Sequence, residues 1–398
     1  MSTGRIDFHQ HVVPPFWAEA LAAHGGDPSG WSSPAWTPEN AIDFMDSQGI
    51  AMGILSLTAP GVTGCSGAKR RDLARRVNEY TASLVAKRPD RFGNFMTLPL
   101  PDVEGALAEL ERAFRDLKAN GVILLSNYEG RYLGDPAFEE LWKELDRRKA
   151  VVFVHPGKPA IAIIDGIPGP IVDYPFDTTR TAVQLVLNGV TARYKQARII
   201  LSHAGGFLPY ASDRFSELAG AVRVDAPSPK DILKEFQRFY FDTALSSGPA
   251  ALPSLQAFAA PGHILYGSDF PYAPAAIGAA FTAKLDAYQH ISKAERDAIN
   301  SESAIALFEG VRSKNSSEAP PPFTLPPDGN NARVRPVARG IEQTCRGGCS
   351  YPEGTAARCP SPDDSARHGN VRHTRSGLAA GSARQRGSPW TSTPPSPT

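Results

Sequence analysis

The chain has 398 residues, and its 42 basic and 41 acidic side chains leave a formal net charge of +1. So small a charge provides no bulk attraction to nucleic acid or to an anionic membrane surface. The sequence has no stretch near the ~20 apolar residues that span a membrane and no basic-then-apolar leader at its start. Its four cysteines are too few for a disulfide scaffold and fit a reducing compartment. We therefore expect a cytoplasmic protein with no nucleic-acid or membrane partner.

Strand-like apolar runs alternate with segments of helical spacing along most of the chain. The eight predicted strands cover residues 5–13, 50–58, 93–98, 121–126, 151–155, 198–203, 239–243 and 263–269. The predicted helices cover residues 71–87, 103–119, 136–149, 177–194, 210–222 and 293–308. Alternating strands and helices indicate an α/β protein with a parallel sheet. Eight such units predict a closed (β/α)8 TIM barrel.

Two connections, residues 12–38 and 157–176, are longer than is usual in such folds. Both follow strands that end in candidate ligand residues, so we expect both to lie over the same mouth of the barrel. The first is rich in aromatic residues, which favours the wall of a pocket for a flat or apolar ligand. Surface decoration is the alternative. The aromatic residues concerned are Phe16, Trp17, Trp31 and Trp36.

The composition changes from about residue 313, where Ser, Pro, Gly and Arg dominate and aliphatic residues become sparse. Such a segment cannot bury enough apolar surface to offset the entropy lost on ordering. We therefore predict a barrel domain over residues 1–312 and a disordered tail over residues 313–398. The cysteines and histidines of the tail match no compact zinc module in their spacing.

Two histidines stand two residues apart in the first predicted strand, at His9 and His11. Residues i and i+2 of a strand point to the same face, so the two imidazoles can coordinate one metal ion. Two ordinary surface histidines are the alternative interpretation. Three further strands favour the metal, because each ends in a suitable side chain at the place where barrel enzymes carry their chemistry: His155, His203 and Asp269.

The other five histidines do not lie at strand ends, and we interpret them as ordinary surface or loop residues: His24, His263, His290, His368 and His373.

Three imidazoles and one carboxylate form a nitrogen-rich ligand set that suits Zn²⁺, with Mn²⁺ as the rival. The predicted ligands are His9, His11, His155 and Asp269. The fourth strand contains no Lys or Glu that would bridge a second metal, so we expect one divalent ion. His203 is then left as an unliganded base or hydrogen-bond donor at the same rim.

These motifs resemble the amidohydrolase superfamily, in the branch typified by aminocarboxymuconate-semialdehyde decarboxylase. The resemblance covers about residues 5–311 and rests on His-x-His in strand one, Phe-Val-His-Pro in strand five, Ser-His-Ala-Gly-Gly in strand six and Gly-Ser-Asp-Phe-Pro in strand eight. It implies that His9, His11, His155 and Asp269 hold the metal and that His203 is catalytic. Relatives often form dimers, so a homodimer is one candidate for the oligomeric state, which the sequence leaves open.

The chain departs from the muconate enzymes at Ala41, where those enzymes carry an arginine shortly after a Trp-x-Pro-Glu stretch. Other segments are similar to 6-methylsalicylate decarboxylases, namely residues 25–31, 125–128, 132–136 and 174–180. This similarity implies a carbon–carbon lyase of secondary metabolism that converts 6-methylsalicylate, a small aromatic acid, to 3-methylphenol and CO2.

A mechanism follows in which Asp269 protonates the ring carbon that bears the carboxylate, while His203 positions or exchanges the proton. Direct loss of CO2 would instead leave a high-energy aryl carbanion. We predict that aromatic side chains sandwich the ring and that Arg180 orients a polar substituent. Ordinary packing, or an ion pair for the arginine, is the alternative for each. The predicted aromatic contacts are Phe16, Trp17, Phe176 and Phe270.

The same polar residues are compatible with two other functions. One is a hydrolase that opens a lactone or amide with metal-activated water, using Asp269 or His203 as base. The other is a barrel that binds a ligand without turnover. A complete set of four ligands and a base argues against the second.

Overall fold

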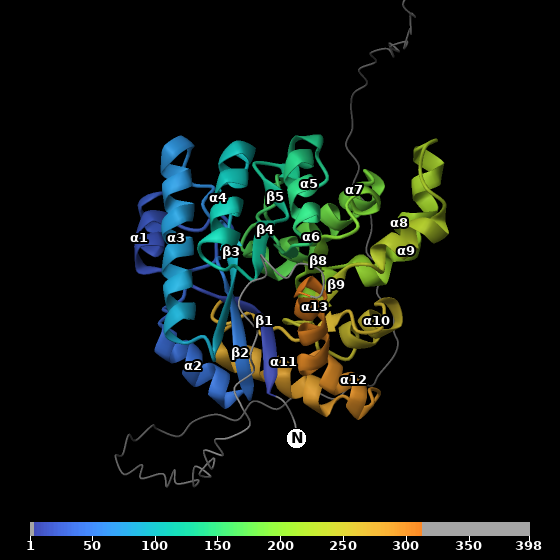
Figure 1. Cartoon of the computed structure of the whole chain (residues 1–398). Helices are drawn as coiled ribbons and strands as arrows, with labels where there is room; N and C mark the ends of the chain where they lie inside the picture. Colours follow the sequence, from blue (N-terminus) through green and yellow to red (C-terminus); the bar gives the residue numbers. More distant parts are fainter. Residues whose placement is uncertain (1–3, 313–398) are drawn as a thin grey trace, which may run out of the picture. The chain divides into compact units, whose positions relative to one another are not determined.

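An eight-stranded parallel sheet forms the centre of the protein, in a computed structural model that describes residues 4–312 (Figure 1). The predicted tail, residues 313–398, lies outside the described residues. The strands follow one another around the sheet in chain order: β1 (Arg5–His11), β2 (Ile50–Ser56), β3 (Phe92–Thr97), β4 (Gly121–Leu125), β7 (Val151–His155), β8 (Arg198–Leu201), β9 (Tyr240–Asp242) and β10 (Ile264–Leu265).

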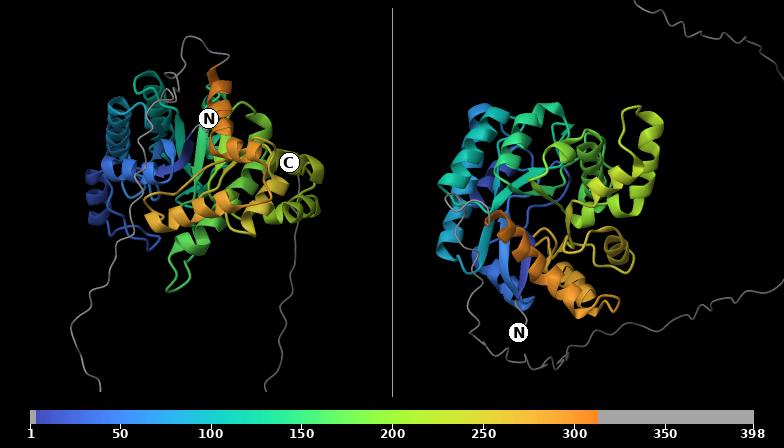
Figure 2. Two further views of the ribbon diagram at one scale, coloured as in Figure 1. Left: turned by 90° about the horizontal axis from the view of Figure 1, so that it is seen from below. Right: turned by 45° about the vertical axis from the view of Figure 1, so that its right-hand side comes forward.

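Backbone hydrogen bonds between β1 and the segment after β10 close the sheet. The N–H of Phe8 donates to the carbonyl of Tyr266 at 3.0 Å, and the N–H of His11 donates to that of Phe270 at 2.7 Å. Helices surround the sheet, as two further views show (Figure 2). The predicted TIM barrel is therefore confirmed. None of the helices among residues 4–312 is long and apolar enough to cross a membrane.

All eight predicted strands are present, and seven of them end one to four residues earlier than predicted. The difference matters most for β8, which stops at Leu201, and for β10, which stops at Leu265. Beyond them His203 and Asp269 adopt left-handed backbone angles, with φ of 53° and 62°, which no strand can contain. Both side chains therefore project from tight bends just past the strand ends.

The six predicted helical regions are helical. Asp135 caps the third of them, because its side chain accepts a hydrogen bond from the N–H of Ala137. The region predicted over residues 293–308 contains a π-helical turn, Ala298–Glu302, between two α-helices. The observed helices of these regions are α3 (Gly67–Lys87), α4 (Val103–Arg115), the 3₁₀ turn Pro136–Phe138 with α5 (Glu139–Arg147), α6 (Gly169–Leu187) with α7 (Val190–Arg193), α8 (Leu208–Val222), and α12 (Lys293–Asp297) with α13 (Ser303–Arg312).

Five helices were not predicted, and both long connections contain helical residues that were not expected there. Residues 12–38 contain α1, and the second half of residues 157–176 is the beginning of α6, which continues through Pro175. A short antiparallel hairpin, β5 (Asn127–Tyr128) with β6 (Arg131–Tyr132), also follows β4. The additional helices are α1 (Pro15–Ala23), α2 (Pro38–Ser47), α9 (Pro229–Phe236), α10 (Ala251–Phe258) and α11 (Ala275–Ala287).

A column of aromatic rings within the barrel's core supports the ligand end of β1. Phe308 of α13 stacks on Phe8 at 5.3 Å between ring centroids, and Phe8 lies 6.0 Å from Phe95. Phe95 stacks on Phe153 at 5.8 Å, and Phe153 meets the edge of His9 at 5.0 Å. Close packing of this kind fixes side-chain positions, so the contact with Phe153 restricts the position of the His9 imidazole.

Candidate metal centre

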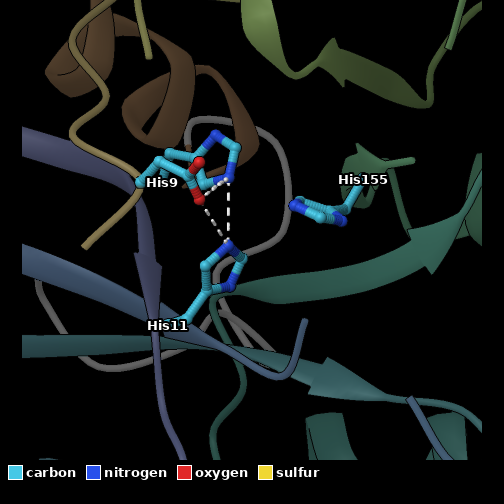
Figure 3. Close-up of side chains that lie close together, drawn as sticks. His9, His11 and His155 are labelled. Atoms are coloured by element: carbon cyan, nitrogen blue, oxygen red, sulfur yellow. Dashed lines mark hydrogen bonds and ion pairs between the residues drawn. The ribbon is translucent and has the colours of Figure 1, made fainter. Parts of the chain in front are cut away.

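Four buried side chains from three distant parts of the chain converge on one point, and they are the four predicted metal ligands. His9 and His11 come from β1, His155 from the end of β7, and Asp269 from the bend after β10. One possible ligand atom from each lies within 4.8 Å of the others. Figure 3 shows the three imidazoles turned toward one another. The donor types and the spacing fit a single divalent metal ion.

The closest approaches within the cluster identify the atoms that would face the ion. His9 Nε2 lies 3.0 Å from His11 Nε2. Each of these nitrogens is 3.2 Å from Asp269 Oδ1. A one-residue bulge in β1, between Asp7 and Gln10, locally alters its register against β2. The two imidazoles still share one face, as the sequence predicts.

Hydrogen bonds behind the ligands set the direction of two imidazoles. His155 Nδ1 lies 2.8 Å from the Pro156 carbonyl oxygen. His11 Nδ1 lies 3.3 Å from the Ser56 carbonyl oxygen. A ring N–H that donates to a carbonyl fixes the tautomer, so the unprotonated Nε2 of each ring is directed at the cluster.

Asp242 is a site residue that the sequence interpretation missed. It is fully buried at the end of β9. Its Oδ2 lies 2.7 Å from His9 Nδ1, and its Oδ1 accepts a hydrogen bond from the N–H of His203 at 2.8 Å. One carboxylate thus contacts a predicted metal ligand and the predicted catalytic histidine. The sequence did contain an indication of this residue, because the predicted strand 239–243 carries a polar residue, Asp242, near its end.

Asp7 is a second residue that the sequence interpretation missed. It links β1, the first strand of the barrel, to the segment that follows β10, the last strand. Its Oδ1 accepts hydrogen bonds from the N–H groups of His9 and Ser268, both at 3.0 Å, and its Oδ2 accepts one from the Ser268 hydroxyl. Burial raises the pKa of the Asp7 carboxyl to about 6. No pattern in the sequence distinguishes this acid from any other polar residue within a strand.

The two carboxylate oxygens of Asp269 have different neighbours. Oδ1 faces His9 and His11, while Oδ2 lies 3.4 Å from His203 Nε2. The left-handed bend at Asp269 makes this double contact possible. A non-glycine residue in that conformation costs about 1–3 kcal/mol, which the surrounding contacts must offset.

The electrostatics of the cluster favour a positive charge at its centre. Burial alone would lower the pKa of His9, but Asp242 and Asp269 outweigh it and raise this pKa to about 10. Burial lowers the pKa of His11, and it lowers that of His155 well below the ordinary value. Burial opposes ionisation of Asp269, but the neighbouring histidines outweigh it and hold its pKa well below the usual range. A bound cation would take over the charge that His9 otherwise carries.

A cavity of about 660 Å³ opens above the cluster. His155, His203 and Asp269 lie in its wall. Of the five predicted metal-binding and catalytic residues, the other two, His9 and His11, do not line the cavity. The remaining lining is largely aromatic and aliphatic, which suits a flat apolar ring with a few polar groups. It includes Trp31, Tyr174, Phe207, Tyr210, Leu245, Tyr272, Ile277 and Phe281.

The five side chains predicted to bind substrate do not line this cavity. Trp17 is buried and donates its indole N–H to the Gly61 carbonyl at 2.7 Å. Phe16 packs against Tyr80, with ring centroids 5.9 Å apart. Phe270 stacks on Phe44 at 4.3 Å.

Phe176 and Arg180 line a separate hollow beside α6, where the Arg180 guanidinium lies 4.9 Å from the centre of the Tyr132 ring and 5.2 Å from that of Phe176. Within the aromatic-rich first connection, Trp31 lines the main cavity and Trp36 is buried. The reason for these positions is that residues 169–187 are helical. Tyr174 and Pro175 face the metal-side cavity, while the next residue around the helix faces away.

Comparisons with known proteins agree with this geometry. A family model described as amidohydrolase matches residues 6–310. The chain is 42% identical over 320 residues to the decarboxylase yanB of Aspergillus niger, an alignment that covers 76% of this chain and 87% of yanB. It is 41% identical over 320 residues to a 6-methylsalicylic acid decarboxylase of Penicillium expansum, covering 77% of this chain and 97% of that protein.

A solved structure of a dihydroxybenzoic acid decarboxylase from Polaromonas sp. JS666 is similar in fold. Its TM-score to this chain is 0.65 at 26% identity, with 79% of this chain and 99% of that one covered. That structure holds manganese and an inhibitor, 2-nitroresorcinol.

Proposed function

The chain belongs to the amidohydrolase family, and on this premise we propose that it is a metal-dependent, non-oxidative decarboxylase. Its substrate is a 2-hydroxybenzoate-type aromatic acid, with 6-methylsalicylate converted to 3-methylphenol and CO2. The enzyme is thus a carboxy-lyase that breaks a carbon–carbon bond. Relatives named as decarboxylases, at 41–43% identity, support this reaction class.

One observation carries the proposal. The four buried candidate ligands and His203 lie at the base of a largely apolar cavity. Asp269 is one of these ligands and also lines the cavity. A decarboxylase of this type needs a place to hold the carboxylate and a proton donor beside the same carbon. Asp269 meets both needs, because one oxygen faces the ligand histidines and the other faces His203.

We assign the metal to His9, His11, His155 and Asp269. Imidazole nitrogens favour Zn²⁺, and the manganese in the Polaromonas enzyme makes Mn²⁺ the rival. When bound, such an ion supplies Lewis-acid chemistry and a template for the carboxylate and the adjacent phenol oxygen.

The protein's own residues move the proton. The proton passes to the ring carbon that bears the carboxylate, the bond from that carbon to the carboxylate breaks, and its electron pair restores the aromatic ring as CO2 leaves. Asp269 Oδ2 is the donor, and His203 Nε2 at 3.4 Å exchanges the proton with it.

The largely aromatic and aliphatic lining of the cavity suits an aromatic ring. This lining favours the decarboxylase over the alternative that the sequence left open, in which the same site hydrolyses a lactone or an amide.

We also propose that the enzyme is a cytoplasmic homodimer of secondary metabolism. Exposed apolar side chains gather at the rim of the cavity, including Ile171, Phe207, Tyr210 and Ile277. Contiguous apolar surface of this kind is typical of an interaction site. Light scattering of the purified protein would give the mass of a dimer; the mass of one chain would refute this part of the proposal.

The function is tested by supplying 6-methylsalicylate and measuring CO2 and 3-methylphenol by chromatography. We expect turnover that a chelator abolishes and that added Zn²⁺ or Mn²⁺ restores. Silence across a panel of hydroxybenzoates, combined with hydrolysis of aryl lactones, would reject the decarboxylase in favour of the hydrolase.

A further inference from the structure

The hollow beside α6 has a volume of about 480 Å³ and takes no part in the reaction proposed above. It lies on another side of α6 from the main cavity, because Tyr174 lines that cavity whereas Phe176 and Arg180 line the hollow. Phe207 lines both spaces, so the two are neighbours. A ligand in the hollow would therefore lie beside the metal-side cavity without entering it.

The wall of the hollow is mostly apolar and contains no acidic residue. Aromatic side chains predominate, which favours a ligand with a flat apolar body over a small hydrated ion. The four aromatic and two aliphatic side chains of the wall are Tyr132, Phe176, Val183, Leu187, Phe207 and Phe215.

Arg180 is a cation of this wall that lacks an anionic partner. Its guanidinium lies 4.9 Å from the centre of the Tyr132 ring and 5.2 Å from that of Phe176. In the part of the chain that the structure describes, no hydrogen bond or ion pair engages this side chain, which is exposed to a ligand. The nearby acid, Asp177, already accepts hydrogen bonds from three other side chains. Arg180 therefore keeps N–H donors in a planar arrangement that matches a carboxylate.

The other polar side chains of the wall have partners within the protein. Thr179 Oγ1 donates a hydrogen bond to the Pro175 carbonyl at 2.8 Å. Arg223 donates one to the Leu187 carbonyl at 2.8 Å and pairs with Asp225 at 3.6 Å. Hydrogen bonds likewise engage Gln184 and Asn188. One uncompensated positive charge remains in the wall, which fits a ligand with a single negative charge.

We propose that the hollow is a second binding site, for an aromatic monocarboxylate. Arg180 pairs with the carboxylate, and the aromatic wall packs against the ring. A phosphate monoester fits less well, because it carries more negative charge than the one free guanidinium can compensate. The site uses none of the metal ligands and neither His203 nor Asp269, so it stands or falls separately from the proposed decarboxylase.

The test is calorimetric titration of the full-length protein with 3-phenylpropionate, which has a ring and a carboxylate but no ring hydroxyl. Its neutral analogue, 3-phenylpropanamide, is titrated in parallel. We expect one site per chain that prefers the acid by about tenfold, since a hydrogen bond to a charged group is stronger than one to a neutral group. Arg180→Gln removes the charge, and at this site it should bind the acid and the amide equally.

Two further variants sharpen the comparison. Arg75→Gln removes an exposed arginine of α3 that pairs with Glu79, and as the matched control it should keep the full preference for the acid. Arg180→Lys keeps the charge but not the planar pair of donors, so it should keep only part of the preference.

Equal binding of acid and amide by the natural protein would show that the hollow does not recognise a carboxylate. A preference that persists in Arg180→Gln would place the bound acid elsewhere in the molecule. A preference lost equally in Arg75→Gln would trace it to the total charge of the protein. Each of these results overturns the proposal.

Discussion

Asp269 is the residue on which the proposed chemistry depends most. Asp269→Asn keeps the size of the side chain and an oxygen toward the ligand histidines, but the amide cannot carry the proton that Oδ2 exchanges with His203. We expect turnover to fall at least about a hundredfold, which is the usual contribution of a general acid. Assays of CO2 release together with metal analysis check this. Turnover within tenfold of the natural protein, at full metal content, would contradict it.

In the proposed metal site Asp242 contacts His9, so its removal should weaken metal binding without removing a proposed ligand. In Asp242→Asn the charge that orients His9 Nδ1 is lost. Metal affinity should fall about 10- to 100-fold, which is typical for the outer partner of a ligand histidine. Competition with a chromogenic chelator measures the change. Asp225→Asn, an exposed acid that pairs with Arg223 at 3.6 Å, is the control and should leave the affinity unaltered.

At the scale of single elements, α6 is held in place by a buried carboxylate. Asp177 accepts hydrogen bonds from the Tyr132 hydroxyl at 2.6 Å, the Asn127 amide at 2.7 Å and the Ser126 hydroxyl. Ser126 Oγ also accepts a hydrogen bond from the N–H of Gly157, two residues after His155. The network joins α6, the hairpin after β4 and the segment after β7.

Removing this carboxylate should destabilise the whole barrel. Asp177→Ala leaves three buried donors unsatisfied, which predicts a loss of about 2–3 kcal/mol in the free energy of unfolding. Urea denaturation measures it. In the control Asp213→Ala, an exposed residue of α8, the change should stay within about 0.5 kcal/mol. Equal stability of the two variants would show that the network contributes nothing.

The same residue predicts a pH dependence of stability. Burial raises the pKa of Asp177 above that of the unfolded chain, so the folded state binds more protons between the two values. The contribution of Asp177 to the free energy of unfolding is therefore largest in acid and declines as the pH rises through the raised pKa. Asp177→Asn cannot titrate and should lack this decline. Urea unfolding of both proteins over a pH series tests it, and parallel curves would contradict the assignment.

At the scale of the whole molecule, every residue to which we assign a part in the proposed function lies before residue 313. The four ligands, His203, the cavity lining and the barrel's core all belong to residues 4–312. Cutting the chain after Arg312 should therefore leave kcat/KM for 6-methylsalicylate and the midpoint of thermal unfolding unchanged. A folded truncated protein without activity would show that the predicted tail, residues 313–398, contributes to function.

The sequence alone determined the barrel and the ligand cluster. Apolar runs closed by polar residues identified all eight strands, and parallel strands present their carboxyl ends at one rim. His9, His11, His155 and Asp269 could therefore be placed together without coordinates. The β1 bulge and the bends at His203 and Asp269 did not upset this expectation, since they only adjust side chains that already share the rim.

Tertiary structure decided what the sequence could not, which is how loops and helices present their side chains to the cavity. Phe16, Trp17 and Phe270 have the composition of a substrate pocket, yet they pack into the core. Trp31, Tyr174 and Tyr272 line the cavity in their place. The physical reason is that side chains alternate between the two faces of a strand, so the sequence alone shows which residues share a strand's end and face. Which side chains of a helix such as α1 or α6 face the cavity depends instead on the orientation of that helix, which packing against distant parts of the chain sets. Contacts across the closure of the barrel, such as those of Asp7 and Asp242, likewise exist only once distant segments meet.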